Sequence, residues 1–312
     1  MEKDTRNYAT RHCGGNPVSS RPRCPCRSSC FRLHGVSSPW SKDLFCPGKS
    51  LQYLLSIASF AFGAVIGSFL NVVIYRLPDP SRSIAFPASH CPHCSTPIRW
   101  YDNIPMLSYL FLRGRCRACR ERISPRYPLV ELCMASLSLA LYVRFGPGPA
   151  FVCYFPFLAA LLAIIFIDID HQIIPDVISL PGIIIGFAGS FFNPLVSWQQ
   201  SGLGILVGGG LLYAVAITYM LLTRREGMGG GDIKLLAMIG AFLGWQSLLY
   251  VIFASSLIGS VFGIAAMRIQ GRGGRTRIPF GPFLAVAAMS YLFFREEILA
   301  IWQAYLATAG RG

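Results

Sequence analysis

Residues 51–75 read LQYLLSIASFAFGAVIGSFLNVVIY, and this run without a charged side chain decides the fold class. About 20 consecutive apolar residues suffice for a helix to cross a bilayer, so the run predicts a transmembrane helix. Gly63, Gly67 and Ser68 would form a face of small residues against which a second helix can pack closely. Asn71, near the end of the run, is either a hydrogen-bond partner for another helix or part of a functional site, and we favour the first interpretation.

The composition of the whole chain agrees with a membrane protein. Its 312 residues are 53% hydrophobic and 13% charged, and the mean hydropathy is +0.50. Soluble domains contain about 25% charged residues. The net charge of +14 could suggest nucleic acid as a partner. The basic residues, however, gather in short loops between apolar runs, which is the distribution of a membrane protein. We therefore expect membrane lipid, and no nucleic acid, around this chain.

Seven further apolar segments follow the first, so the sequence predicts about eight transmembrane helices. These segments are 128–143, 145–167, two within 177–223 that are separated by a turn near Asn193-Pro194, 232–245, 247–267 and 278–294. The expected fold class is an all-α polytopic membrane protein with a small cytoplasmic zinc-binding insert. Gly208-Gly209-Gly210 lies within one of the segments and is interpreted as helix packing, not as a nucleotide-binding loop.

The arginine-rich loops predict the orientation of the chain in the membrane. Alternating threading of eight spans puts the loops 76–127, 168–176, 223–231 and 268–277 on one side. The positive-inside rule makes that side cytoplasmic and places both termini outside. Residues 1–50 conflict with this scheme, because they are basic and polar. We predict that they are a disordered extension or the product of a mis-assigned start codon.

Four cysteines in the basic insert form two C-x-x-C pairs, Cys91-Pro92-His93-Cys94 and Cys116-Arg117-Ala118-Cys119. Each pair can form a knuckle, and two knuckles complete a tetrahedral four-thiolate zinc site without an open position for water. A metal would supply folding energy that so small an insert cannot obtain from packing. Two disulfides or a redox pair are the alternatives. We favour zinc, because the insert is expected in the reducing cytoplasm.

Two carboxylates stand at the ends of apolar segments. Asp168 follows the segment 145–167, and Asp232 follows a glycine run in Glu226-Gly227-Met228-Gly229-Gly230-Gly231-Asp232-Ile233-Lys234. An ionisable group at the edge of hydrocarbon is costly, so its default interpretation is functional. Both acids fall on the predicted cytoplasmic edge. Glycines at 229 and 231 would let a backbone or substrate approach Asp232 without a Cβ in the way.

Two carboxylates in proximity can divide acid and base work. They cannot both stay ionised at close range, so one accepts a proton from water while the other donates one. Taken singly, each is as readily a helix N-cap or a solvated surface acid. Spacing also leaves open a proton relay in a transporter, and a non-catalytic assembly scaffold around the zinc insert is a further alternative.

The ordered motifs resemble one known family. The chain is similar to the type IV prepilin peptidases of bacteria, membrane aspartic proteases of the G-x-G-D class, over roughly residues 60–290. The matching segments are Gly67-Ser68-Phe69-Leu70-Asn71-Val72, Arg76-Leu77-Pro78, both cysteine pairs, Asn103-Ile104-Pro105, Ser124-Pro125-Arg126-Tyr127-Pro128-Leu129-Val130-Glu131, residues 168–176, Glu226-Gly227-Met228-Gly229-Gly230-Gly231-Asp232-Ile233-Lys234-Leu235-Leu236 and Pro279-Phe280-Gly281-Pro282.

The resemblance implies that Asp168 and Asp232 are the catalytic aspartates, with Asp170 and Asp176 as lower-ranked alternatives. It also implies a site in the bacterial inner membrane that cleaves the basic leader of type IV prepilins or type II secretion pseudopilins on the cytoplasmic face. Many members also methylate the new amino terminus with S-adenosylmethionine. No methyl-donor pocket is recognisable in the sequence.

Two further charged residues are candidates for supporting roles. Glu131 would support substrate or helix packing, and Lys234 would tune Asp232 or anchor the helix at the interface. The expected organisation of the whole chain is an extension at 1–50, a first transmembrane helix at 51–76, the zinc-binding insert at 77–127, a seven-helix membrane catalytic domain at 128–303 and a tail at 304–312.

Overall fold

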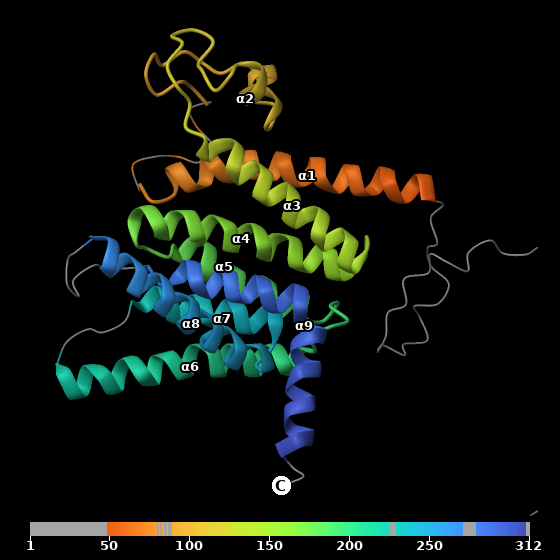
Figure 1. Cartoon of the computed structure of the whole chain (residues 1–312), viewed down its shortest axis with the longest axis vertical. Helices are drawn as coiled ribbons and strands as arrows, with labels where there is room; N and C mark the ends of the chain where they lie inside the picture. The colour runs from red at the N-terminus through yellow and green to blue at the C-terminus, as the bar shows by residue number, and fades with distance from the viewer. Residues whose placement is uncertain are drawn as a thin grey trace, which may run out of the picture. The chain divides into compact units, whose positions relative to one another are not determined.

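The structure is a computed structural model that describes residues 49–79, 81, 83, 86, 89–224, 229–270 and 279–309. Within these residues the regular elements are all helical. They are α1 (Lys49–Arg76), the short 3-10 helix η1 (Trp100–Asn103), α2 (Leu107–Phe111), α3 (Arg126–Phe145), α4 (Pro149–His171), α5 (Asp176–Gly189), α6 (Trp198–Thr223), α7 (Gly230–Leu243), α8 (Gln246–Gln270) and α9 (Gly281–Ala309) (Figure 1). The predicted extension 1–50 lies outside the described residues, except for the two that begin α1.

The chain is an all-α, multi-pass membrane protein, but the expected number of eight spans is too high. Within the described residues, five helices are long and apolar enough to cross a membrane, namely α1, α3, α4, α6 and α8. The other expected segments also form helices. However, α5 and α7 have 14 residues each, or about 21 Å at 1.5 Å per residue, against about 30 Å of hydrocarbon. Charged residues at 295–297 and a kink at Phe294 interrupt α9.

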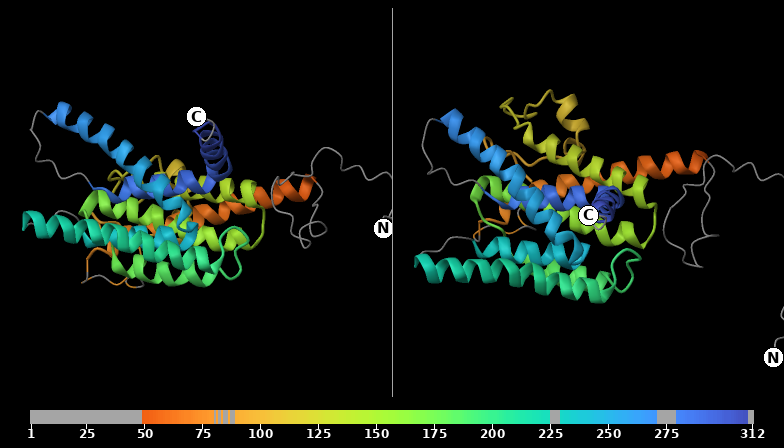
Figure 2. Two further views of the ribbon diagram at one scale, coloured as in Figure 1. Left: turned by 90° about the horizontal axis from the view of Figure 1, so that it is seen from below. Right: turned by 60° about the horizontal axis from the view of Figure 1, so that its bottom comes forward.

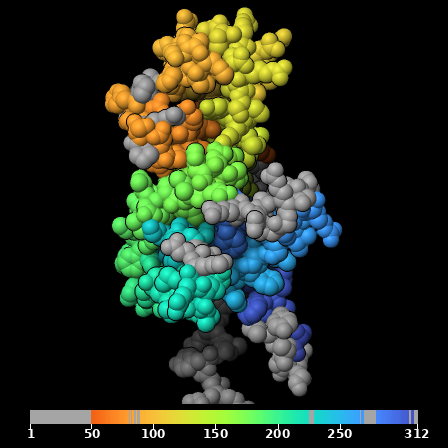
Figure 3. All heavy atoms as spheres, turned by 90° about the vertical axis from the view of Figure 1, so that its left-hand side faces the viewer, coloured from red at the N-terminus to blue at the C-terminus, as the bar shows by residue number. Residues whose placement is uncertain are grey.

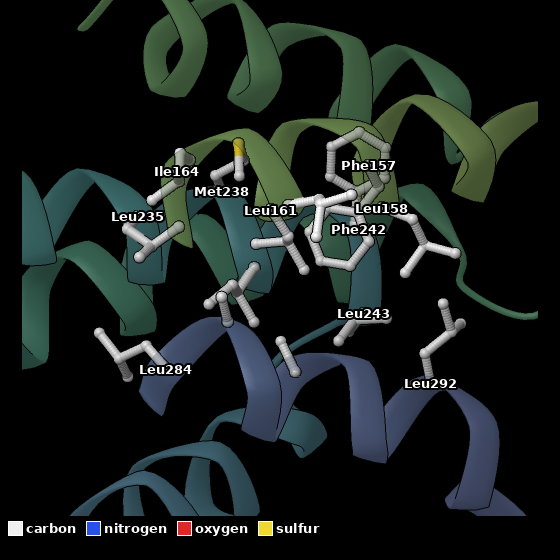
Figure 4. Close-up of a cluster of buried hydrophobic side chains, with 14 of the residues drawn as sticks. Phe157, Leu158, Leu161, Ile164, Leu235, Met238, Phe242, Leu243, Leu284 and Leu292 are labelled. Atoms are coloured by element: carbon white, nitrogen blue, oxygen red, sulfur yellow. The ribbon is translucent and has the colours of Figure 1, made fainter. Parts of the chain in front are cut away.

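Helix α4 lies at the centre of the bundle and packs against α3, α5, α7 and α9. Figure 4 shows side chains of α4, α7 and α9 converging on one cluster, in which the rings of Phe157 and Phe242 stack at 4.5 Å. Eleven of the 23 residues of α4 are buried among these neighbours, which explains why its sequence is apolar almost throughout, with no polar stripe. A lipid-facing helix such as α6 is equally apolar for a different reason, so hydropathy alone does not distinguish the two.

Small residues set the closest helix contacts. A Cβ added to Gly204 of α6 would lie 2.1 Å from the carbonyl oxygen of Gly240 in α7, so the two backbones touch. The predicted small face of α1 packs in the same way on α3, because a Cβ on Gly63 would lie 2.6 Å from Ser138. Asn71 Nδ2 donates to the Tyr127 carbonyl at 3.0 Å, which is the interhelical hydrogen bond that the sequence favoured.

The helix termini that carry polar groups lie together at one end of the bundle. The C-terminal ends of α6 and α8 both lie at the left in each view of Figure 2. Hydrogen bonds and ion pairs join the end of α4 to the starts of α3 and α9, and the start of α5 to the start of α7. Both candidate catalytic aspartates lie at this end of the bundle.

Candidate active site and metal centre

Asp168 lies in the last turn of α4 and is only 5% exposed. Its Oδ2 accepts a hydrogen bond of 3.0 Å from the backbone N–H of Gly281, the first residue of α9. A helix N-terminus carries a partial positive charge, so this contact stabilises a carboxylate. A Cβ on Gly281 would lie 2.5 Å from the same oxygen, and position 281 therefore requires glycine.

Asp232 lies in the first turn of α7, half-buried, and interacts electrostatically with Asp168. Ile174 links the two acids through their neighbouring glycines. A Cβ added to Gly231 would lie 2.9 Å from the Ile174 side chain, and a Cβ added to Gly281 would lie 3.2 Å from it. Gly229 is open toward the site, because a Cβ there would meet only Asp232 Oδ2, at 3.9 Å.

The two lower-ranked acids are occupied by cations from neighbouring helices. Asp170 forms an ion pair with Arg126 at the start of α3. The Lys234 ammonium donates to both oxygens of Asp176, at 2.7 and 2.8 Å, and so links α7 to α5. Lys234 therefore pairs with Asp176 and not with Asp232. Asp168 and Asp232, by contrast, form no ion pair with a cation among the described residues, and they interact electrostatically with each other.

Glu131 is buried in α3, and its Oε2 accepts a hydrogen bond of 2.7 Å from the backbone N–H of Met106. Met106 precedes α2 and has an unusual positive φ of 57°. The carboxylate thus ties the insert to the second turn of α3. The predicted role of Glu131, support of substrate or of helix packing, stays a prediction. The contact with the insert is a separate role, for which the sequence contained no signal.

The four insert cysteines converge, with all Sγ atoms within 4.8 Å of one another. Sγ of Cys91 lies 3.8 Å from that of Cys119, and Sγ of Cys94 lies 4.0 Å from that of Cys116, so each knuckle contacts the other. A tetrahedral ion with bonds of about 2.3 Å to sulfur separates its ligands by about 3.8 Å, and the cluster fits such an ion. None of the six described cysteines forms a disulfide.

Each knuckle has the same backbone design. The first cysteine of each pair donates its N–H to a carbonyl five residues later, namely Cys91 to Thr96 at 3.0 Å and Cys116 to Glu121 at 2.8 Å. A hydrogen bond with the Thr96 side chain lowers the pKa of Cys94 to about 6. Backbone hydrogen bonds lower the pKa of Cys116. Both shifts favour the thiolate form that binds metal.

Two residues of the candidate site had no assigned role in the sequence. Gly281 was part of a matching motif, and its position before a proline at a helix start is the signal that could have suggested a close backbone approach. Ile174 lay in the matching segment 168–176, directly before Pro175, but no role of its own was assigned to it.

Comparison with known proteins identifies the family. Residues 61–145 match the Bacterial Peptidase A24 N-terminal domain, and residues 155–264 match the Type IV leader peptidase family. The Prepilin leader peptidase/N-methyltransferase of Pseudomonas putida is 39% identical over 80% of this chain and 93% of its own length. The protein of that name from Aeromonas hydrophila shows the same identity and coverage. The one from Pseudomonas aeruginosa is 37% identical over 83% of this chain and 98% of its own length.

No solved structure matches this chain at a significant level. The sequence relatives, by contrast, match over nearly their whole length. The chain therefore belongs to the type IV leader peptidase family.

Proposed function

We propose that this protein is a prepilin leader peptidase and N-methyltransferase. It removes the leader of type IV prepilins and methylates the amino terminus that cleavage exposes. Family membership and the names of the relatives support this function. The observation that carries the hydrolytic half is that Asp168 and Asp232 lie at the same end of the bundle, close enough to interact electrostatically.

In the proposed mechanism Asp168 is the base. The Gly281 N–H at the start of α9 favours its carboxylate form, and Asp168 takes a proton from the attacking water. Asp232 gives its proton to the oxygen of the scissile carbonyl, which completes a tetrahedral intermediate. As this intermediate collapses, Asp168 gives its proton to the leaving nitrogen and Asp232 takes one back from a hydroxyl of the intermediate, so both acids return to their starting states. Gly229 leaves room for the extended substrate backbone beside Asp232, whereas the missing side chain of Gly231 makes room for Ile174.

The insert supplies a structural metal site. We assign zinc to Cys91, Cys94, Cys116 and Cys119, where four thiolates close the coordination sphere. The bound ion holds the two knuckles together. The methylation half needs S-adenosylmethionine, which supplies the methyl group when bound, and this half rests on family membership without an assigned residue.

The charge distribution indicates the side of the membrane on which the substrate is cleaved. We place the acids and the insert at the cytoplasmic face of the bacterial inner membrane, because the described arginines of the insert, with Arg224 and Arg268 at the ends of α6 and α8, lie at that end. Type II secretion pseudopilins share the basic leader and apolar helix of prepilins, so they belong to the proposed substrate class.

The decisive experiment is cleavage of a prepilin by membranes that contain the full-length protein and a labelled methyl donor. Asp168→Asn and Asp232→Asn should each reduce cleavage at least about 1,000-fold, because each removes one partner of a coupled pair. Asp176→Asn is the matched control. It removes only an exposed ion pair, which contributes little to stability. Normal cleavage by both first variants would disprove the assignment.

A further inference from the structure

The hydrogen bond between Met106 and Glu131 sets the depth of α2 in the membrane. Glu131 lies five residues into α3, which corresponds to about 7.5 Å along the helix axis. Helix α3 is long and apolar enough to cross the membrane. The residue before α2 therefore lies beside α3, inside its first two turns, and not beyond its end. This is the depth of the lipid headgroups and the outer acyl carbons.

The outer face of α2 is apolar. Leu107, Leu110 and Phe111 are spaced i, i+3 and i+4, so they share one face of the helix. Their exposed fractions are 51%, 71% and 81%. A face of this kind on a soluble insert would be costly in water. At the depth set by Glu131 it would instead contact acyl chains, as interfacial helices do.

A basic hollow of about 570 Å³ lies next to α2, which contributes Tyr109 to its lining but none of the three apolar residues. Arg113, Arg115 and Arg122 line it together with Tyr109 and Ser124, and no acidic side chain contributes to its lining. Arg115 and Arg122 are paired across an isolated antiparallel bridge, which brings their side chains together. None of the three arginines forms an ion pair with a described residue. Residues 123–125 of the lining lead directly into α3, so the hollow lies at the membrane boundary.

The charge of the hollow selects among possible ligands. A basic leader peptide would be repelled, and the cationic sulfonium of S-adenosylmethionine has the same sign as the three arginines. Guanidinium groups bind phosphate through paired hydrogen bonds. A soluble acidic peptide would satisfy the arginines but would leave the apolar face of α2 in water. An anionic phospholipid satisfies both features at the depth at which they occur.

We propose that α2 and the basic hollow form a docking surface for the anionic leaflet of the membrane that the bundle spans. Leu107, Leu110 and Phe111 insert between acyl chains, and the three arginines bind headgroup phosphates. The docked insert is held against the site end of the bundle by lipid as well as by Glu131. Figure 3 views the molecule from the end at which α3 begins and shows the outer surface of the insert uncovered by other segments. This inference does not depend on leader cleavage.

Amide hydrogen exchange of the full-length protein in nanodiscs tests the proposal. One set of nanodiscs contains phosphatidylcholine alone, and the other contains phosphatidylcholine with about one third phosphatidylglycerol, a fraction chosen to give a strongly anionic surface. Exchange of residues 107–115 should be at least about 10-fold slower in the anionic nanodiscs. Each arginine near such a surface strengthens binding about fivefold. The variant Arg113→Gln/Arg115→Gln/Arg122→Gln should therefore lose this protection.

The matched control removes the same charge elsewhere. Arg120→Gln/Arg224→Gln/Arg268→Gln replaces three exposed arginines outside the hollow and should keep the protection. A zinc content equal to that of the original protein verifies that the knuckles of each variant are folded. A benzophenone amino acid at position 111 should form adducts with lipid acyl chains.

Three results would overturn the proposal. The first is equal exchange in the two kinds of nanodisc. The second is equal loss of protection in both triple variants, which would show a general charge effect. The third is protection by a soluble acidic peptide or by inorganic phosphate in nanodiscs of phosphatidylcholine alone, with no lipid adduct at position 111. Such a result would assign the hollow to a ligand from solution.

Discussion

The insert and the bundle are stabilised in opposite ways. Between residues 89 and 125, Cys91, Ser108 and Gly114 are the residues that are buried, whereas α4 alone buries eleven. The bundle is held by close packing, because moving an apolar side chain from lipid into the bundle provides no hydrophobic driving force. The insert is held by four sulfur atoms around one point, by a few hydrogen bonds and by its link to Glu131. Loss of a single ion should therefore unfold one region and leave the other intact.

Metal removal should produce the largest effect and separates the two regions directly. A structural zinc site contributes on the order of 10 kcal/mol to the folding of its module. A strong chelator, or Cys91→Ser, should make residues 89–125 sensitive to protease while the helical circular dichroism of the bundle changes little. Cys153→Ser is the control, because Cys153 lies in α4 and is no part of the cluster. A bundle that unfolds together with the insert would contradict the comparison.

Packing of the bundle is tested at Gly240. A Cβ there would lie 2.2 Å from the Gly204 carbonyl oxygen, so Gly240→Ala must separate α6 from α7. We expect a loss of about 3 kcal/mol, at the upper end for overpacking, measured by thermal unfolding in detergent. Gly210→Ala is the matched control on α6. It meets nothing within 4 Å and should be neutral or slightly stabilising. Zinc content should be unchanged in both variants.

The regular parts of the fold could be predicted, and the contacts between them could not. Hydropathy located the helices, because a spanning helix must be apolar over its whole length. It overestimated the number of spans, because α5 and α7 are apolar but have only 14 residues each. The residues of α7 from Leu235 onward are apolar because they are buried, whereas α5 exposes apolar side chains such as Val177 and Ile184. The cysteine cluster followed from spacing, which sets the reach of each knuckle. The contacts of Gly281 with Asp168, of Met106 with Glu131 and of Lys234 with Asp176 join residues far apart in sequence, and no local pattern encodes them.

A contact of this kind is tested by Gly281→Ala, which should impair activity and leave both regions folded. The new Cβ would force Asp168 Oδ2 away from its 3.0 Å hydrogen bond. A displacement of about 1 Å in a catalytic group costs about 100-fold in rate. Prepilin cleavage should fall to that extent through kcat, with KM and the unfolding temperature nearly unchanged. Gly210→Ala again serves as the control, and an equal loss of activity there would make the effect nonspecific.

The smallest expected effect lies in the two knuckles and concerns their backbone. Ser95 and Arg120, each directly after the second cysteine of a pair, have φ values of 54° and 62°. The left-handed conformation costs a residue with a Cβ roughly 1 kcal/mol, and glycine avoids that cost. Ser95→Gly and Arg120→Gly should each strengthen zinc retention by up to about fivefold in competition with a chromophoric chelator. The gain is reduced by the greater conformational entropy that glycine gives to the unfolded chain. Neither variant should shift the unfolding temperature of the bundle, because the knuckles share no buried core with it. Should either variant stabilise the bundle as much as the knuckles, the two regions would be one cooperative unit, and the zinc site would contribute to the packing of the membrane helices.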